Sequence, residues 1–193
     1  KRPSVFAVLL CILCSVASAA QLRESVVIVQ PELSADGIAA YRSIADDFRK
    51  QNLNNIASHF ESMADGKSSS GFIARDRYGR SVVVTNRRVV TFADAVTIIL
   101  TWKGDSEVAL SMEHCRILYE DPDIDFALVQ LPEGAFEEPP RLELAESIPA
   151  DGETVWAAGY PSLSGVRTWR LGEGQVINRS IFVDRMGPEQ FAV

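Results

Sequence analysis

From Gly71 onward, the chain consists of short runs rich in β-branched and aromatic residues, separated by turn signals. Turn-like links at 77–80 and 103–105 join adjacent runs directly. Many short strands at this spacing are typical of an antiparallel sandwich or barrel. We therefore expect a mainly β fold over this part of the chain. The runs read GFIAR, SVVVTN, DAVTIILTW, EVALSM, CRILYE, DFALVQL, TVWAAGY, GQVINRS and IFVD.

The residues before this β-rich part follow a different pattern. A short β-like run, VVIVQ, ends at Pro31, and a helical pattern then opens with Ser34 or Asp36 as the N-cap. A polar interruption at 51–55 predicts two helices, and a linker of small residues, 64–70, closes the segment. We interpret the amphipathic stripe of these helices as a packing face, with a membrane or partner role as the alternative. The stripe comprises Ile38, Tyr41, Ile44 and Phe48, followed by Leu53, Ile56, Phe60 and Met63.

The first 20 residues have the layout of a secretory signal, with a basic start, an apolar run and small residues of the A-x-A type. Cleavage is expected after Ala19 or Ala20. The mature chain would then be exported, to the periplasm or the extracellular space, without a membrane span. An uncleaved membrane anchor is the alternative, although the apolar run is short for crossing a bilayer. We expect a signal at 1–20, a strand and helical segment at 21–67, and a β-rich domain at 68–193.

Charge and cysteine content narrow the classes of partner and the source of stability. The formal net charge is -7, which argues against nucleic acid or anionic lipid as the main partner. Beyond the predicted signal the sequence has one cysteine, Cys115, so no intramolecular disulfide can form. The fold must therefore depend on a packed core, and we expect Cys115 to be a small buried residue in it.

No independent metal or cofactor site is evident in the sequence. The two histidines, His59 and His114, do not stand at metal-ligand spacing with other ligand residues. His114 and Cys115 are neighbours, but successive side chains of a strand point to opposite faces. The glycines of AAGYP and GEG do not form a phosphate-binding loop. We therefore predict no metal and no cofactor.

Four segments occur in order along the β-rich part: SSSGFIARDRYGRSVVVTNRRVV, DPDIDFALVQL, GETVWAAGYPSLSG and RLGEGQVI. Together they resemble the HtrA/Deg type of trypsin-like serine proteases, over about two thirds of the chain. That family has a G-S-G-F-I-like strand, T-N-x-H-V-V with the catalytic histidine, and D-x-x-x-D-[ILF]-A-[LV] with the aspartate that orients it. Its second barrel opens with G-[ED]-x-V-x-A-x-G-x-P. The resemblance implies a trypsin-like double β-barrel preceded by a helical segment; a generic β-sandwich is the alternative.

The resemblance assigns two residues to catalytic positions. Asp125 falls on the aspartate, where the alternative reading is a turn carboxylate before a core strand. Arg88 falls on the histidine. A triad histidine accepts the proton of the serine nucleophile because the pKa of imidazole lies near neutrality. A guanidinium stays protonated and offers no lone pair, so Arg88 cannot act as a general base, although it could pair with Asp125. Arg87 fills a variable position and should be an exposed charge.

Neither histidine is a good substitute for the missing base, and no serine nucleophile is recognisable. His59 precedes the barrel, and His114 lies on a different predicted strand from Arg88. The motif G-x-S-G-G does not occur. Ser162 and Ser164 lie in an earlier loop and are expected to be polar turn residues. On this mapping the domain at 68–193 is truncated before the nucleophile and its second barrel is incomplete, most simply because the sequence is a fragment.

Three functional hypotheses follow. The leading one is an exported, catalytically inactive protease homologue that binds unfolded polypeptide or another envelope protein. The second is an active serine endopeptidase whose serine lies in a missing C-terminal part and whose base is unconventional. The third is a β-rich interaction domain unrelated to proteases. In all three, the helical segment at 34–64 would provide a packing layer or an oligomer contact.

Overall fold

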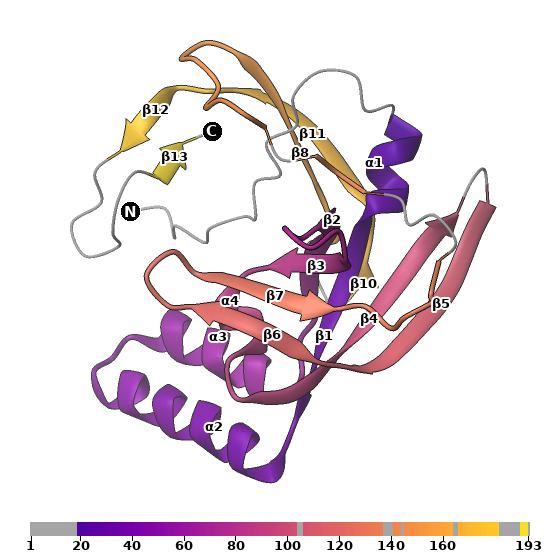
Figure 1. Ribbon diagram of the computed structural model, residues 1–193. Coiled ribbons are helices and arrows are strands. Elements are labelled where there is room, and N and C mark those ends of the chain that lie inside the picture. Colours follow the sequence, from indigo (N-terminus) through magenta and orange to yellow (C-terminus); the bar gives the residue numbers. More distant parts are fainter. Residues whose placement is uncertain are drawn as a thin grey trace.

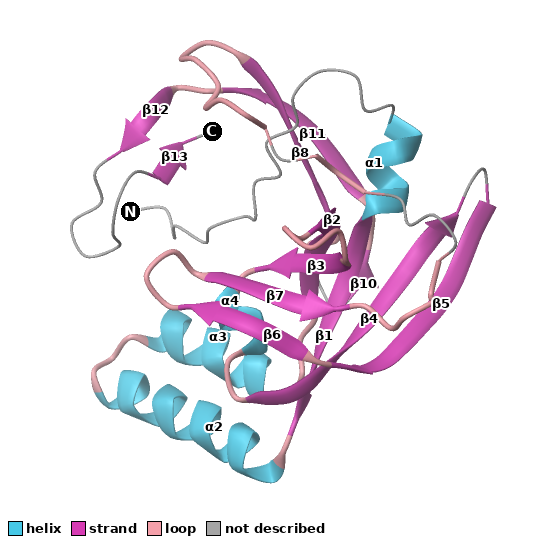
Figure 2. Ribbon diagram, viewed as in Figure 1, coloured by secondary structure: helices cyan, strands magenta, loops and turns pink. Residues whose placement is uncertain are grey.

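The computed structural model describes residues 19–103, 106–136, 141–143, 145–163, 166–181 and 190–192. The predicted signal therefore lies almost entirely outside the described residues. Strands dominate the described part and form one large sheet and three two-stranded sheets (Figure 2). The expectation of a mainly β fold with a helical segment near its N-terminus is confirmed.

The large sheet contains seven strands, all paired with antiparallel neighbours, and it curls into a half-barrel (Figure 1). Consecutive strands are neighbours in most pairs, as short connections favour. In spatial order the strands are β5 (Ser106–Cys115), β4 (Ala93–Lys103), β1 (Val26–Leu33), β2 (Ser69–Arg75), β3 (Ser81–Thr85), β7 (Phe126–Gln130) and β6 (Ile117–Asp121).

Strand β1 is longer than the sequence predicted, because it continues through Pro31. Strand β2 pairs with β1 only from Val26 to Val29, so beyond that point β1 has β4 as its one described neighbour. A proline is tolerated where one side of a strand is unpaired, since it has no N–H to donate. Although β1 comes from the segment predicted at 21–67, it lies between β4 and β2 in the sheet.

The remaining strands follow the large sheet in sequence. The predicted single run GQVINRS is divided, because Val176 leaves the strand ladder. Its N–H donates to the carbonyl oxygen of Glu153 at 2.9 Å, and its own carbonyl accepts from Gly152 at 2.7 Å. The pairs are β8 (Thr154–Gly159) with β11 (Arg170–Gln175), β9 (Ser162–Leu163) with β10 (Val166–Arg167), and β12 (Asn178–Ile181) with β13 (Gln190–Ala192).

Two of the helices lie side by side, α2 (Ala35–Lys50) and α3 (Asn54–Ala64), in the segment where the sequence predicted a broken helix (Figure 1). Ser34 is the N-cap of α2, and its Oγ accepts a hydrogen bond from the Gly37 N–H at 3.2 Å. Tyr41 is buried and contacts neighbouring aromatic rings.

The predicted apolar stripe is only partly buried, because Leu53 and Ile56 at the start of α3 are exposed. Short helices α1 (Ala19–Ser25) and α4 (Arg87–Val90) complete the set. None of the helices in the described ranges is long and apolar enough to span a membrane.

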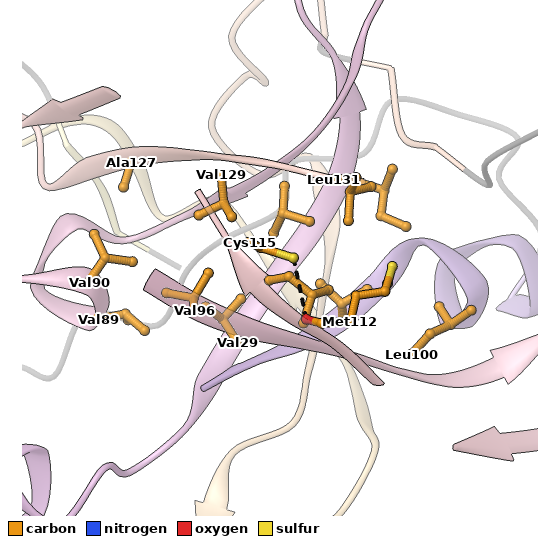
Figure 3. Close-up of a cluster of buried hydrophobic side chains, with 14 residues drawn as sticks. Val29, Val89, Val90, Val96, Leu100, Met112, Cys115, Ala127, Val129 and Leu131 are labelled. Carbon is orange, nitrogen blue, oxygen red and sulfur yellow. Dashed lines mark hydrogen bonds between the residues drawn. The ribbon is translucent and has the colours of Figure 1, made fainter. Parts of the chain in front are cut away.

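The largest apolar cluster lies on one face of the curled sheet and includes Val29, Val96, Ala127 and Val129 (Figure 3). Cys115 belongs to this core, as predicted, and its Sγ donates to the carbonyl oxygen of Met112 at 3.3 Å. Burial raises the pKa of this thiol, which disfavours the reactive thiolate. The adjacent His114 side chain is exposed, so the two residues do point to opposite faces.

Candidate functional site

The sequence TNRRVV forms a corner where β3 ends and the four-residue helix α4 begins. Thr85 is fully buried, and its Oγ1 donates to the carbonyl oxygen of Ser70 on the neighbouring strand at 2.9 Å. Asn86 occupies the N-cap position and is also buried. These contacts fix the direction of the backbone immediately before Arg87.

Arg88 contacts Asp125 through both its backbone and its side chain. The Arg88 N–H donates to Oδ1 of Asp125 at 2.9 Å, and the Nη1 of its guanidinium donates to Oδ2. The Nη2 of the same guanidinium donates to the side-chain oxygen of Asn86 at 3.2 Å. The structure therefore brings together the two residues that the sequence assigned to one catalytic pair.

The main chain of Asp125 also forms hydrogen bonds with the corner. Its carbonyl oxygen accepts from the Arg87 N–H at 3.0 Å and from the Asn86 amide Nδ2 at 3.2 Å. Asp125 also has a φ of 51°, in the left-handed region that Asp and Asn tolerate better than most residues. It is thus a turn residue before β7 as well as the ion-pair partner of Arg88.

The side chain of Arg87 points to a different partner. Its Nε lies 3.4 Å from Oε2 of Glu120, and both side chains are more than a third exposed. Exposed ion pairs of this kind contribute about 0–1 kcal/mol to the free energy of unfolding. The expectation of an exposed charge is consistent with this position, and Glu120 is the partner that the sequence did not indicate.

A cavity of about 660 Å³ lies beside the corner. One part of its lining comes from α3 and the linker that follows it, including His59 and Lys67. Another part comes from β8 and β11, including Ala158 and Arg170, and the corner itself contributes Arg88. The volume falls within the ~300–1,000 Å³ that is usual for ligand clefts.

The sequence model of the trypsin-like peptidase domain matches residues 69–187. The chain belongs to the trypsin-like peptidase family. No curated protein matches the chain in sequence. The match begins at the first residue of β2, and the half-barrel with its curled seven-stranded sheet agrees with the trypsin-like fold. The match overturns the hypothesis of a β-rich domain unrelated to proteases.

In this trypsin-like peptidase domain, the glycine of the AAGYP segment permits a close approach between β8 and β2. A Cβ at Gly159 would lie 2.8 Å from the Oγ of Ser70. That Oγ accepts a hydrogen bond from the Tyr160 N–H at 2.8 Å. Strand β8 is thereby tied to the large sheet next to Thr85, and the motif glycine has a packing role.

His59 lies in the same cavity as Arg88, which the sequence did not reveal. Burial lowers the pKa of His59, and the positive charges of Arg88 and Lys67 lower it further. A neutral imidazole is therefore favoured near neutral pH. The sequence offered no reason to expect His59 near Arg88, because His59 precedes the predicted barrel. The pattern of the helix itself does not indicate which element lies beside it.

The other candidate residues from the sequence lie away from the corner or outside the described residues. His114 contacts Glu32 instead of the corner, with its Nδ1 2.6 Å from Oε2 of that carboxylate. Ser162 begins the short strand β9, and Ser164 lies outside the described residues. Within the described ranges, no group of three or more His, Cys, Asp or Glu residues could hold a metal ion.

Proposed function

We propose that this trypsin-like peptidase homologue is an exported protein of HtrA/Deg type that has lost catalysis and binds unfolded polypeptide or another envelope protein. The observation that carries the proposal is the contact of Arg88 with both carboxylate oxygens of Asp125. Arg88 stands where the HtrA/Deg resemblance expects the histidine base, and Asp125 where it expects the orienting aspartate.

A guanidinium in this position removes the chemistry of the triad. It carries no lone pair that could accept the proton of a serine hydroxyl. Its attachment to Asp125 and Asn86 also keeps the charged group in place at the corner. Loss of the base typically costs on the order of a million-fold in turnover.

The cavity supports a binding role for the same site. Its apolar lining includes Met63, Val89 and Ala158, and its polar lining includes Asn55 and Ser62. Mixed linings of this type suit peptide segments, because apolar side chains are buried while amides orient the backbone. Binding would then persist although the residue at the position of the base cannot transfer a proton.

Hydrolysis and binding assays test the proposal directly. The native full-length protein and an Arg88→His variant are incubated with unfolded casein, and an Arg116→His variant serves as a control outside the cavity. We expect binding by fluorescence anisotropy and no hydrolysis by the native protein. Hydrolysis by the native protein would sink the proposal, as would failure to bind any unfolded polypeptide. Hydrolysis gained only by Arg88→His would support the assignment of the pair.

One observation favours a second candidate function, an active endopeptidase with an unconventional base. His59 lines the cavity together with Arg88. Burial and the nearby positive charges lower its pKa, which favours the neutral imidazole that a general base requires. The serine would have to come from sequence beyond Val193, and reading the coding frame for G-x-S-G-G tests that point. If native hydrolysis is found, His59→Gln should abolish it and His114→Gln should leave it unchanged.

A further inference from the structure

We propose that the cavity beside Arg88 selects an acidic peptide segment, one that carries Asp or Glu side chains within an extended chain. This inference rests on the proposed binding function and names the class of polypeptide that the site prefers. It is carried by the distribution of charge around the cavity, which differs from the charge of the whole molecule.

The cavity is positively charged although the protein is acidic. Its lining contains Lys67, Arg88 and Arg170, and none of its described lining residues is Asp or Glu. The whole chain has 26 acidic and 19 basic residues. A cluster of positive side chains in a molecule of net charge -7 produces a local potential opposite in sign to that of the surrounding surface.

Two of these charges are not neutralised within the described part of the chain. Arg88 is bound to Asp125, whereas neither Lys67 nor Arg170 forms an ion pair with any residue that the structure describes. Four other Lys and Arg side chains in the described part do have such partners: Arg49, Lys50, Arg80 and Arg87. Lys67 and Arg170 are therefore positioned to bind carboxylates of a second molecule.

The two cations without an ion pair lie on separate elements of the cavity wall. Lys67 lies in the linker between α3 and β2, whereas Arg170 begins β11. Cations on separate elements can each meet a different carboxylate of one extended segment. The apolar lining of the cavity, which includes Val89 and Ala158, would contact the alkyl parts of the same segment.

Peptide titrations test the charge selectivity. A fluorescein-labelled octapeptide of alternating Glu and Leu, with its C-terminus amidated, is compared by anisotropy with its Gln–Leu counterpart. We expect the Glu peptide to bind at least about tenfold more tightly at low salt, and the difference to shrink as salt screens the charges. Equal affinity of the two peptides would overturn the proposal. So would preference for a Gln–Leu peptide with a free C-terminal carboxylate, because that result assigns the site to a chain terminus.

Matched variants locate the selectivity. A Lys67→Gln/Arg170→Gln double variant should lose about tenfold in affinity for the Glu peptide. A Lys50→Gln/Arg75→Gln variant removes the same charge from exposed positions outside the cavity lining and should bind like the native protein. If both variants weaken binding equally, the proposal fails.

The peptide and casein results together separate this proposal from the proposed function. If both peptides bind equally while unfolded casein still binds, only the acidic preference is refuted. If no polypeptide binds, the proposed function itself is refuted.

Discussion

The carboxylate of Asp125 accepts hydrogen bonds from both the backbone N–H and the guanidinium of Arg88. The backbone bond places residue 88 at a fixed distance from the aspartate whatever its side chain is. On the proposed assignment of residues 88 and 125 to a catalytic pair, the corner keeps the arrangement that a base and its aspartate need, while the side chain present cannot accept a proton. A histidine at this position would begin from the same backbone anchor, which is why Arg88→His is an informative variant.

Asp125→Asn should lower the free energy of unfolding by about 1–2 kcal/mol, because the charge-assisted bonds to Arg88 are replaced by weaker neutral ones. The loss stays this small because solvent screens the pair: the Arg88 side chain is 37% exposed and that of Asp125 is 25% exposed. Asp125→Ala should cost more, since alanine tolerates a φ of 51° less well than asparagine. Urea denaturation of the three proteins measures these differences.

A suitable control for this pair is Asp123→Asn, an exposed residue of the same loop. Its effect should stay within about 0.5 kcal/mol of the native protein. If Asp125→Asn were no more destabilising than Asp123→Asn, the ion pair would contribute nothing measurable to the fold.

Tyr41→Phe should destabilise the protein by about 1–2 kcal/mol. The Tyr41 hydroxyl donates to the carbonyl oxygen of Thr91 at 2.5 Å and lies 3.3 Å from that of Arg88. Phenylalanine would leave these carbonyl groups without their donor, and the side chain is only 2% exposed. Burial also raises the pKa of Tyr41 to about 12, so the hydroxyl stays protonated at neutral pH. Thermal unfolding of Tyr41→Phe beside Tyr78→Phe, which alters an exposed ring, isolates the buried bond.

Gly71→Ala should destabilise the protein by about 1–3 kcal/mol through overpacking. A Cβ at this position would lie 2.8 Å from side-chain methyl groups of both Val29 and Val83, and 2.9 Å from the carbonyl oxygen of Val84. Gly172→Ala is the matched control, because its Cβ would meet nothing within 4 Å. Equal unfolding midpoints for the two variants in guanidinium chloride would show that the sheet relaxes around the added methyl group.

Much of the fold follows from local signals in the sequence. Ser34 predicts the start of α2, the polar stretch at 51–55 predicts the break before α3, and the alternation of turn signals predicts most strands. The boundaries that differed depend on contacts between distant segments. Strand β1 can continue through Pro31 because β2 pairs with it only up to Val29. Val176 leaves its strand because its backbone forms hydrogen bonds with the 150–153 turn.

The candidate site shows the same division between local and distant information. Arg88 and Asp125 could be paired from sequence because each lies in a segment with a family motif, and the structure places them in contact. The positions of His59 and Lys67 could not be predicted, because they depend on how α2 and α3 pack against the corner. Helical periodicity predicts which face of a helix is buried but gives no information about the element that covers it.

Glu32→Gln should remove part of the pH dependence of stability on the acidic side. Burial by itself raises the pKa of Glu32, but hydrogen bonds from the Thr97 hydroxyl and from the backbone and ring of His114 outweigh it and lower the pKa below its ordinary 4.5. A carboxyl group with a lowered pKa in the folded state contributes stability above pH 4.5. That contribution is lost as the pH falls below 4.5 through the folded-state pKa.

The native protein should therefore exceed Glu32→Gln in free energy of unfolding at pH 7, by about 1 kcal/mol, and the gap should close as the pH falls below 4.5. Urea denaturation at a series of pH values measures both curves. Glu113→Gln, an exposed neighbour of His114, should follow the native curve throughout. A gap that stayed constant from pH 7 to pH 3 would mean that Glu32 acts through packing, because ionisation of its carboxylate would then make no difference to folding.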